Sequence, residues 1–215
     1  MSGDRLWFFS VDYTTVLYGS GNCSILFVLY PQLLIDKVII DDNSAVKAAV
    51  DHLVEQGCRH ITYIGGPKSL LIHQHRFSGY RQALKNADLE PDPGLEYHGV
   101  YGSLEEGKQA AHHFFKNSQV PDGIFATADL LAIGAMKQIK SLGLKVPQDV
   151  AMVGFSNWEI SEMYEPSLTT VRQPGRKMGA TAMNMLLERI ENGGGEYRTK
   201  ILATELLVRE SSVRS

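Results

Sequence analysis

Apolar positions along most of this chain follow two alternating periods. Short runs of β-branched and aliphatic residues are typical of buried strands, whereas apolar residues that recur every three or four positions are typical of helices. From Val38 onward these two kinds of segment take turns. The strand-like runs lie at 38–40, 61–64, 97–100, 124–127 and 150–155, and the helix-like stretches lie at 46–54, 77–84, 103–115, 131–142 and 175–190. This order predicts an α/β fold in which helices cover both faces of a parallel sheet.

Several residues indicate where the predicted helices begin and end. The sequence Ser103-Leu-Glu-Glu106 has the form of a capping box, in which the serine and the second glutamate satisfy backbone N–H groups at a helix start. Asp129 is placed as an N-cap for the helix that follows 124–127. Gly57 and Gly143 are placed to end the helices before them. Residues 201–209 are predicted to form one final strand.

The first 36 residues do not share this alternation. They are rich in aromatic and β-branched residues without a helical period, and we expect two or three strands there. So short a segment cannot supply three βα units, because each crossover takes about 10–12 residues. We therefore expect it to leave one face of the helix that begins at Gly175 partly bare, namely Met178, Ala182, Met185 and Leu186.

Composition excludes several functional classes. The net charge is −3, so the basic excess of a free-standing nucleic-acid binder is missing. The apolar run at 25–30 ends at Pro31 and is far shorter than the roughly 20 residues of a membrane span. The N-terminus lacks the basic and then apolar start of a secretory signal. Two cysteines, Cys23 and Cys58, favour a reduced, cytoplasmic setting.

Motifs for catalysis, metals and cofactors are incomplete. Gly154-Phe-Ser-Asn-Trp158 is similar to a hydrolase nucleophile elbow around Ser156, but that turn requires glycine where Trp158 stands. The histidine pairs 73/75 and 112/113 point to different sides of a helix, so we interpret them as solvated surface residues rather than metal ligands. Gly65-Gly-Pro67 lacks the spacing of a phosphate-binding loop. We expect no enzyme activity, no metal and no cofactor.

Polar residues at predicted strand ends are better candidates, because ligands of parallel α/β sheets lie at the carboxyl ends of the strands. Arg76 can bind hydroxyls or a carboxylate through its planar guanidinium, or pair with an acid at the surface. Asp129 can accept hydrogen bonds from hydroxyls or cap its helix. Ser156 and Asn157 follow a strand. Gln173 lies where the chain leaves one set of strands and helices for the next. Its side chain can contact a ligand or fix this crossover in place.

A series of motifs in a fixed order carries a family resemblance. Two of them are Val153-Gly-Phe-Ser-Asn157 and Pro166-Ser-Leu-Thr-Thr-Val-Arg-Gln-Pro174. The others lie at 37–43, 52–57, 60–67, 76–84, 121–129, 132–136 and 146–155. Each motif is weak alone. In this order they resemble the effector-binding domain of LacI/GalR transcription regulators over about residues 37–215.

The resemblance implies a fold of the type I periplasmic-binding-protein kind, with two α/β lobes, three crossovers and an effector in the cleft. By resemblance, residues of about 42–172 and 200–210 form the C-terminal lobe, and about 173–199 form a remnant of the N-terminal lobe. The ligand-contacting positions of the family fall on Arg76, Asp129, Ser156, Asn157 and Gln173. An aromatic residue that often stacks on the effector falls on Tyr101.

The same resemblance implies a function. We expect an effector-sensing domain whose ligand, a sugar or a purine-like molecule, shifts the DNA affinity of a homodimeric parent regulator. A solute-binding protein of a transport system shares the fold and is the alternative. The family's helix-turn-helix and the first half of its N-terminal lobe have no match in residues 1–36. We therefore expect DNA contact only through a segment that this chain lacks, and no contact with a membrane.

Overall fold

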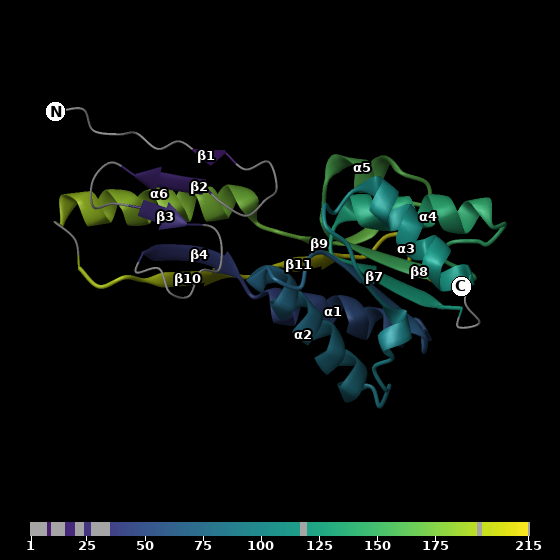
Figure 1. Cartoon of the computed structure of the whole chain (residues 1–215). Helices are drawn as coiled ribbons and strands as arrows, with labels where there is room; N and C mark the ends of the chain where they lie inside the picture. Colours follow the sequence, from purple (N-terminus) through teal and green to yellow (C-terminus); the bar gives the residue numbers. More distant parts are fainter. Residues whose placement is uncertain are drawn as a thin grey trace. The chain divides into compact units, whose positions relative to one another are not determined.

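The computed structural model describes residues 8–9, 16–19, 24–26, 35–116, 120–192 and 195–214 (Figure 1). Two compact units make up the chain, and each is built from separate stretches of sequence. Unit 1 comprises Met1–Asp41 and Pro174–Ala203, and unit 2 comprises Asp42–Gln173 and Thr204–Ser215. The chain therefore passes from one unit to the other three times. No helix among the described residues is long and apolar enough to cross a membrane.

Unit 2 contains a six-stranded sheet in the order β11-β9-β8-β7-β5-β6. β11 is antiparallel to β9, and every other neighbouring pair is parallel. The predicted α/β fold with a mostly parallel sheet is confirmed. The strands are β5 (Ile61–Gly65), β6 (Glu96–His98), β7 (Gly123–Ala126), β8 (Ala151–Ser156), β9 (Thr169–Arg172) and β11 (Glu205–Leu207).

Helices cover both faces of this sheet (Figure 1). One pair, α1 and α2, packs together on one face, and a second pair, α3 and α4, packs together on the other. A short 3-10 turn precedes β6, and the short helix α5 follows β8. The bounds are α1 (Asp42–Glu55), α2 (Leu71–Asn86), Pro93–Leu95 for the turn, α3 (Leu104–Lys116), α4 (Asp129–Ser141) and α5 (Glu159–Met163).

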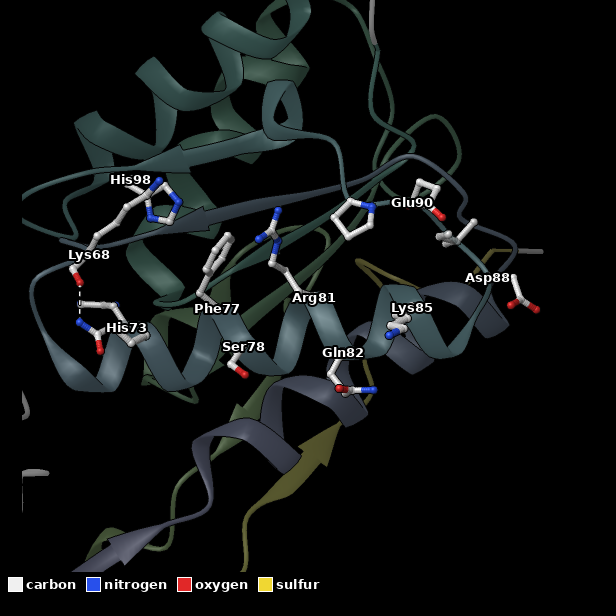
Figure 2. A pocket seen from close by; sticks show the side chains of 13 residues that line it. Lys68, His73, Phe77, Ser78, Arg81, Gln82, Lys85, Asp88, Glu90 and His98 are labelled. Carbon is white, nitrogen blue, oxygen red and sulfur yellow. Dashed lines mark hydrogen bonds between the residues drawn. The ribbon is translucent and has the colours of Figure 1, made fainter. Parts of the chain in front are cut away.

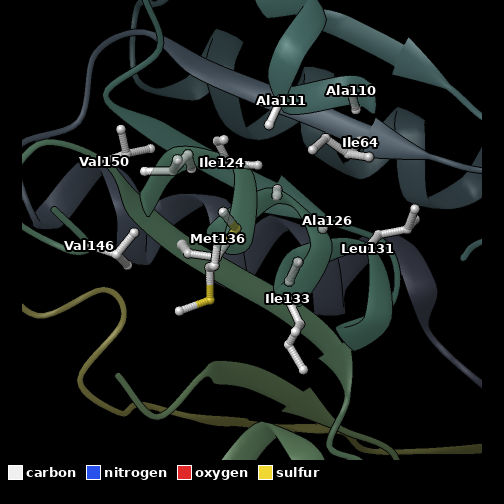
Figure 3. Packing of buried hydrophobic residues seen from close by; sticks show 14 of the residues in the cluster. Ile64, Ala110, Ala111, Ile124, Ala126, Leu131, Ile133, Met136, Val146 and Val150 are labelled. Atoms are coloured by element: carbon white, nitrogen blue, oxygen red, sulfur yellow. The ribbon is translucent and has the colours of Figure 1, made fainter. Parts of the chain in front are cut away.

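One buried apolar cluster of unit 2 lies under α3 and α4 (Figure 3). There Ile64 and Ile124 of the sheet belong to one buried cluster with Leu131 of α4. Burying each such side chain contributes about 1.5–3 kcal/mol. Two glycines let the helices approach closely: a Cβ on Gly107 would lie 2.1 Å from the Leu131 carbonyl oxygen, and one on Gly134 would lie 2.0 Å from that of Leu104.

The predicted helix ends have mixed outcomes. The capping box is confirmed, because the Glu106 N–H donates to Ser103 Oγ at 3.2 Å while the Ser103 N–H donates to Glu106 at 3.3 Å. Gly57 and Gly143 follow their helices with positive φ angles of 86° and 79°. The N-cap role of Asp129 was wrong. Ala128 is the N-cap, without a side-chain cap bond, because the Asp129 carboxylate binds tertiary partners instead.

Unit 1 contains a five-stranded sheet in the order β1-β2-β3-β4-β10. β4 lies between β3 and β10 and runs parallel to both, whereas β2 is antiparallel to β1 and β3. Three short strands thus fall in the segment for which the sequence predicts two or three. The bounds are β1 (Phe8–Phe9), β2 (Val16–Gly19), β3 (Ser24–Leu26), β4 (Asp36–Ile40), β10 (Thr199–Leu202) and helix α6 (Gly175–Glu191).

Two expectations about the late part of the chain have different outcomes. Of the α6 face expected to be partly bare, Ala182 and Met185 are buried with Val38 of β4, whereas Met178 and Leu186 are only partly buried. The final strand, predicted as one run over 201–209, is two strands. β10 joins the sheet of unit 1, and the chain enters unit 2 only at Thr204, rather than at about residue 200, to form β11. A single strand-like stretch of sequence cannot show that its two halves pair with different sheets.

Candidate ligand-binding site

The carboxyl ends of the five parallel strands of unit 2 meet at one edge of the sheet. Arg76 lies in α2, the helix after β5, and Tyr101 follows β6. Asp129 follows β7, and Ser156 with Asn157 ends β8. Gln173 comes directly after β9. Every predicted site residue therefore comes from this edge, where parallel α/β sheets bind their ligands.

Arg76 is held inside the protein. Its Nε donates to Asp42 Oδ1 at 2.7 Å, and its Nη1 donates to the Thr127 carbonyl oxygen at 2.9 Å. The guanidinium also lies over the Phe155 ring, 3.8 Å from the centroid. Only 7% of the side chain is exposed. The sequence predicted that Arg76 either binds a ligand or pairs with an acid at the surface. It does pair with an acid, Asp42, but inside the protein. Its Nη2 makes no hydrogen bond among the described residues and is the atom that a ligand could use.

Asp129 is the most enclosed of the candidates, with 2% of the residue exposed. One carboxylate oxygen accepts from Thr170 Oγ1 at 2.6 Å, and the other accepts from the Trp158 N–H at 2.7 Å. Burial raises the pKa of Asp129, although these hydrogen bonds oppose the change. A Cβ on Gly154 would lie 2.5 Å from the carboxylate, so glycine is needed beside it.

The turn after β8 has an uncommon backbone. Ser156 and Asn157 have positive φ angles of 116° and 55°, and such conformations in residues other than glycine cluster at functional sites. Side chains fix the turn from both sides. Asn157 Oδ1 accepts from Arg209 Nη2 at 2.8 Å, and Ser156 Oγ accepts from Gln173 Nε2 at 3.2 Å. The crossover glutamine is thereby tied to the end of β8.

Tyr101 differs from the other candidates in its exposure, because 81% of the residue is accessible to solvent. Its loop is nevertheless fixed, because the N–H groups of Val100 and Tyr101 donate to the Glu106 carboxylate at 2.6 and 2.9 Å. Burial raises the pKa of Glu106, but these backbone hydrogen bonds outweigh it and the pKa falls below its usual value. The same glutamate therefore caps α3 and positions the aromatic residue.

The structure links some predicted residues and leaves others separate. Thr170 joins two of them, because its Oγ1 donates to Asp129 and accepts from the Asn157 N–H at 3.3 Å. Arg76 and Asp129 come from helices on opposite faces of the sheet and do not touch. They approach the same edge, since Arg76 binds the carbonyl of Thr127, two residues before Asp129.

Sequence reasoning missed the partners that position these residues. Asp42 was interpreted only as part of the end of a strand, yet it binds Arg76. Thr170 was one of several β-branched residues in a strand. A carboxylate directly after a strand was a usable signal for Asp42, whereas nothing in the sequence distinguishes Thr170 from its neighbours.

One histidine differs from its predicted surface role. His73 is half-buried, and burial lowers its pKa to about 4, so it is not a solvated surface residue. Within the part of the chain that the structure describes, no three histidine, cysteine or acidic side chains come together as a metal site would require.

These features define a class of protein. A mostly parallel sheet, helices on both faces and polar side chains collected at the carboxyl edge are the construction of an α/β domain that binds small molecules. The family profile described as "Periplasmic binding protein-like domain" matches residues 50–212.

Known proteins similar to this chain are transcription regulators. The HTH-type transcriptional repressor CytR of Escherichia coli (strain K12) is 34% identical over 182 residues, which are 85% of this chain and 53% of CytR. The regulator CelR of Thermobifida fusca is 33% identical over 181 residues, which are 84% of this chain and 53% of CelR. The chain spans about half the length of these curated relatives.

The solved structures that are similar to this chain are also those of transcription regulators. A CelR–cellobiose complex superimposes with a TM-score of 0.80 and 32% identity, covering 87% of this chain and 57% of that one. A LacI family regulator from Enterococcus faecium with bound ribose gives a TM-score of 0.81 and 26% identity, covering 90% and 72%. The chain belongs to the periplasmic binding protein-like family and corresponds to the effector-binding part of LacI-type regulators.

Proposed function

We propose that this chain senses a small polar effector, such as a sugar, for a LacI-type transcription regulator. The effector contacts unit 2 at the carboxyl edge of its sheet, through Arg76, Asp129, Ser156, Asn157 and Gln173, with Tyr101 stacking on it. Binding shifts the equilibrium between two states of the regulator and thereby changes its affinity for DNA.

The observation that carries this proposal is the turn after β8. Strained φ angles at Ser156 and Asn157 persist only where surrounding contacts hold them, and here Arg209, Gln173 and Thr170 do so. The turn lies at the strand ends where this class of fold binds ligands. A fixed turn of polar side chains suits recognition of hydroxyl groups, which both donate and accept hydrogen bonds.

The division into units fits the lobes of the family. We propose that unit 2 is the C-terminal lobe and that unit 1 is part of an N-terminal lobe. The similar proteins named above are regulators, and two of them were solved with cellobiose and ribose. These relatives favour a regulator over a solute-binding protein of a transport system, and they favour a sugar as the first ligand to test.

Thermal unfolding with a panel of ligands tests the proposal. The whole chain is heated with cellobiose, ribose, other mono- and disaccharides, purines and nucleosides. A ligand present at about a hundred times its Kd should stabilise the chain by about 2.7 kcal/mol. Calorimetric titration then gives the affinity of each compound that stabilises the protein.

A matched pair of serine variants shows where the ligand binds. Ser156→Ala should weaken binding about tenfold, the effect of one lost hydrogen bond. Ser141→Ala, at the exposed end of α4, should leave the affinity unchanged. Equal affinities of the two variants would place the ligand elsewhere, and stabilisation by no member of the panel would contradict the proposed function.

A further inference from the structure

A groove of about 970 Å³ runs along the outer side of α2 in unit 2 (Figure 2). Pockets for metabolites commonly measure about 300–1,000 Å³. One wall is a face of α2 with side chains at four-residue intervals. The opposite side includes Lys68 before α2, His98 at the end of edge strand β6 and the loop after α2. Of the described residues that line it, none is among the six proposed for the effector. The helix wall includes His73, Phe77, Arg81 and Lys85.

Two imidazole rings at one end of this groove have unused hydrogen-bonding capacity. The Nδ1 of His73 and both ring nitrogens of His98 are buried and have no hydrogen-bond partner. Buried polar side-chain atoms without a partner are rare in native proteins, so three of them in one place call for an explanation. Gly66 leaves room for the His73 ring, because a Cβ there would lie 2.3 Å from His73 Nε2.

Both rings are neutral at physiological pH. Burial lowers the pKa of His73 to about 4 and also lowers the pKa of His98, and the Lys68 charge lowers the latter further. The Gly66 backbone raises the pKa of His98 against these effects but lies outside hydrogen-bonding geometry. A neutral imidazole has one N–H and one bare nitrogen, so each ring can donate one hydrogen bond.

Positive charge lies beside the rings. Lys68 Nζ and Arg81 Cζ lie 5.9 and 5.2 Å from the centroid of the Phe77 ring, which itself lies edge-on to His98 at 5.1 Å. In Figure 2, Phe77 and Arg81 point from α2 toward the side of the groove where His98 lies. Arg81 is paired with Glu96 at 3.4 Å. Among the described residues Lys68 has no acidic partner.

We propose that this end of the groove is a second ligand site, for a small molecule that carries an oxyanion such as a phosphate or a carboxylate. Its oxygens accept from the Lys68 ammonium and from the N–H groups of His73 and His98, so the ligand supplies the partners that these buried atoms lack. Charge-assisted hydrogen bonds from Lys68 provide most of the affinity. The imidazoles provide direction and select an acceptor.

Titration of the whole chain with inorganic phosphate, and separately with acetate, tests this proposal. The side-chain nitrogen resonances of His73 and His98 should shift in NMR spectra at millimolar anion, while those of the exposed His112 should not. A response to phosphate alone identifies a phosphate-bearing ligand, and a response to acetate alone identifies a carboxylate. No response to either anion overturns the proposal.

Variants distinguish a built site from general attraction. Lys68→Ala should weaken anion binding at least about tenfold, as expected for loss of one charge-assisted hydrogen bond. His98→Phe keeps a ring but removes both nitrogens and should also weaken it. Lys85→Ala removes a cation from the far end of the groove and should change little. An equal loss in the Lys85 variant would contradict the site. Ser156→Ala should keep the anion affinity, which separates this test from that of the effector site.

Discussion

Among the residues that the structure describes, each unit has one buried pair of an arginine and an aspartate, and the two pairs are built differently. In unit 1, Arg189 binds Asp36 through two contacts, Nε to Oδ2 at 2.7 Å and Nη2 to Oδ1 at 3.1 Å. Its Nη1 also donates to the Gly195 carbonyl, and its Nη2 also donates to the Glu196 carbonyl. In unit 2, Arg76 binds Asp42 through Nε alone and reaches one carbonyl.

The comparison teaches how an arginine that only stabilises the fold differs from one that could also bind a ligand. A guanidinium has five N–H donors. Arg189 commits all three of its nitrogens to the protein and locks the strand start at Asp36 to the chain before β10. Among the described residues Arg76 Nη2 has no hydrogen-bond partner, and the Phe155 ring supports the plane of the guanidinium. The buried pair of unit 1 is therefore fully engaged by the protein, whereas that of unit 2 leaves one guanidinium nitrogen for the proposed effector.

Removing the acid of unit 1 should have the largest effect. Asp36→Ala leaves Arg189 buried without its counter-charge, which we expect to lower the free energy of unfolding by about 3–5 kcal/mol. Urea denaturation of the wild type and the variant measures this change in the free energy of unfolding. Glu205→Ala, which breaks the exposed pair with Arg172, is the control and should cost less than about 1 kcal/mol. Equal losses would mean that the pair in unit 1 is no more important than a surface contact.

Removing the arginine of unit 2 should weaken binding of the proposed effector, in addition to the loss of stability from leaving Asp42 buried without its counter-charge. Arg76→Ala should weaken effector binding by about 1.5–3 kcal/mol, the range for a charged hydrogen bond. Calorimetric titration with the ligand found in the panel gives this value. Arg81→Ala, five residues further along α2 and half exposed, should leave the affinity unchanged. An Arg76 variant with full affinity would show that the guanidinium serves only Asp42 and Thr127.

Acid titration should give the smallest effect, with opposite signs at two aspartates. Burial raises the pKa of Asp36, but hydrogen bonds from Arg189 and the Arg198 N–H outweigh it and the pKa is lowered. Its contribution to stability is complete above the ordinary aspartate pKa and is lost as the pH falls through the folded pKa. For Asp129 the folded pKa is raised, so its contribution is complete below the ordinary pKa and is lost as the pH rises through the folded value.

Two asparagine variants measure these signs. Between about pH 7 and about pH 3, the stability advantage of the wild type over Asp36→Asn should shrink. Relative to Asp129→Asn, the wild type should gain stability as the pH falls over the same range. Urea denaturation at several pH values follows both. If the stability difference from the wild type changed with pH in the same direction for both variants, the assignment of opposite pKa shifts to Asp36 and Asp129 would be contradicted.

Local features of the sequence predicted local features of the structure. Ser103 and Glu106 are three residues apart, so the capping box could be seen directly. The partners of the site residues are distant: 34 residues separate Arg76 from Asp42, and 41 separate Asp129 from Thr170. No spacing rule reaches so far, so the sequence could place Arg76 and Asp129 near the carboxyl edge of the sheet but could not assign their contacts. The same limit hid the burial of His73, which depends on β5 and β6.

The three passages between the units also determine the order in which the structure can form during synthesis. β4 of unit 1 leaves the ribosome before any strand of unit 2, yet its partner β10 follows all five parallel strands. The sheet of unit 2 is completed still later, when β11 pairs with β9. The nascent chain must therefore carry an incomplete β4 edge while unit 2 collapses around β5 to β9. Pairings between such distant segments form slowly, and open strand edges invite wrong partners meanwhile. Unit 1 is consequently where we expect chaperones to act on this protein.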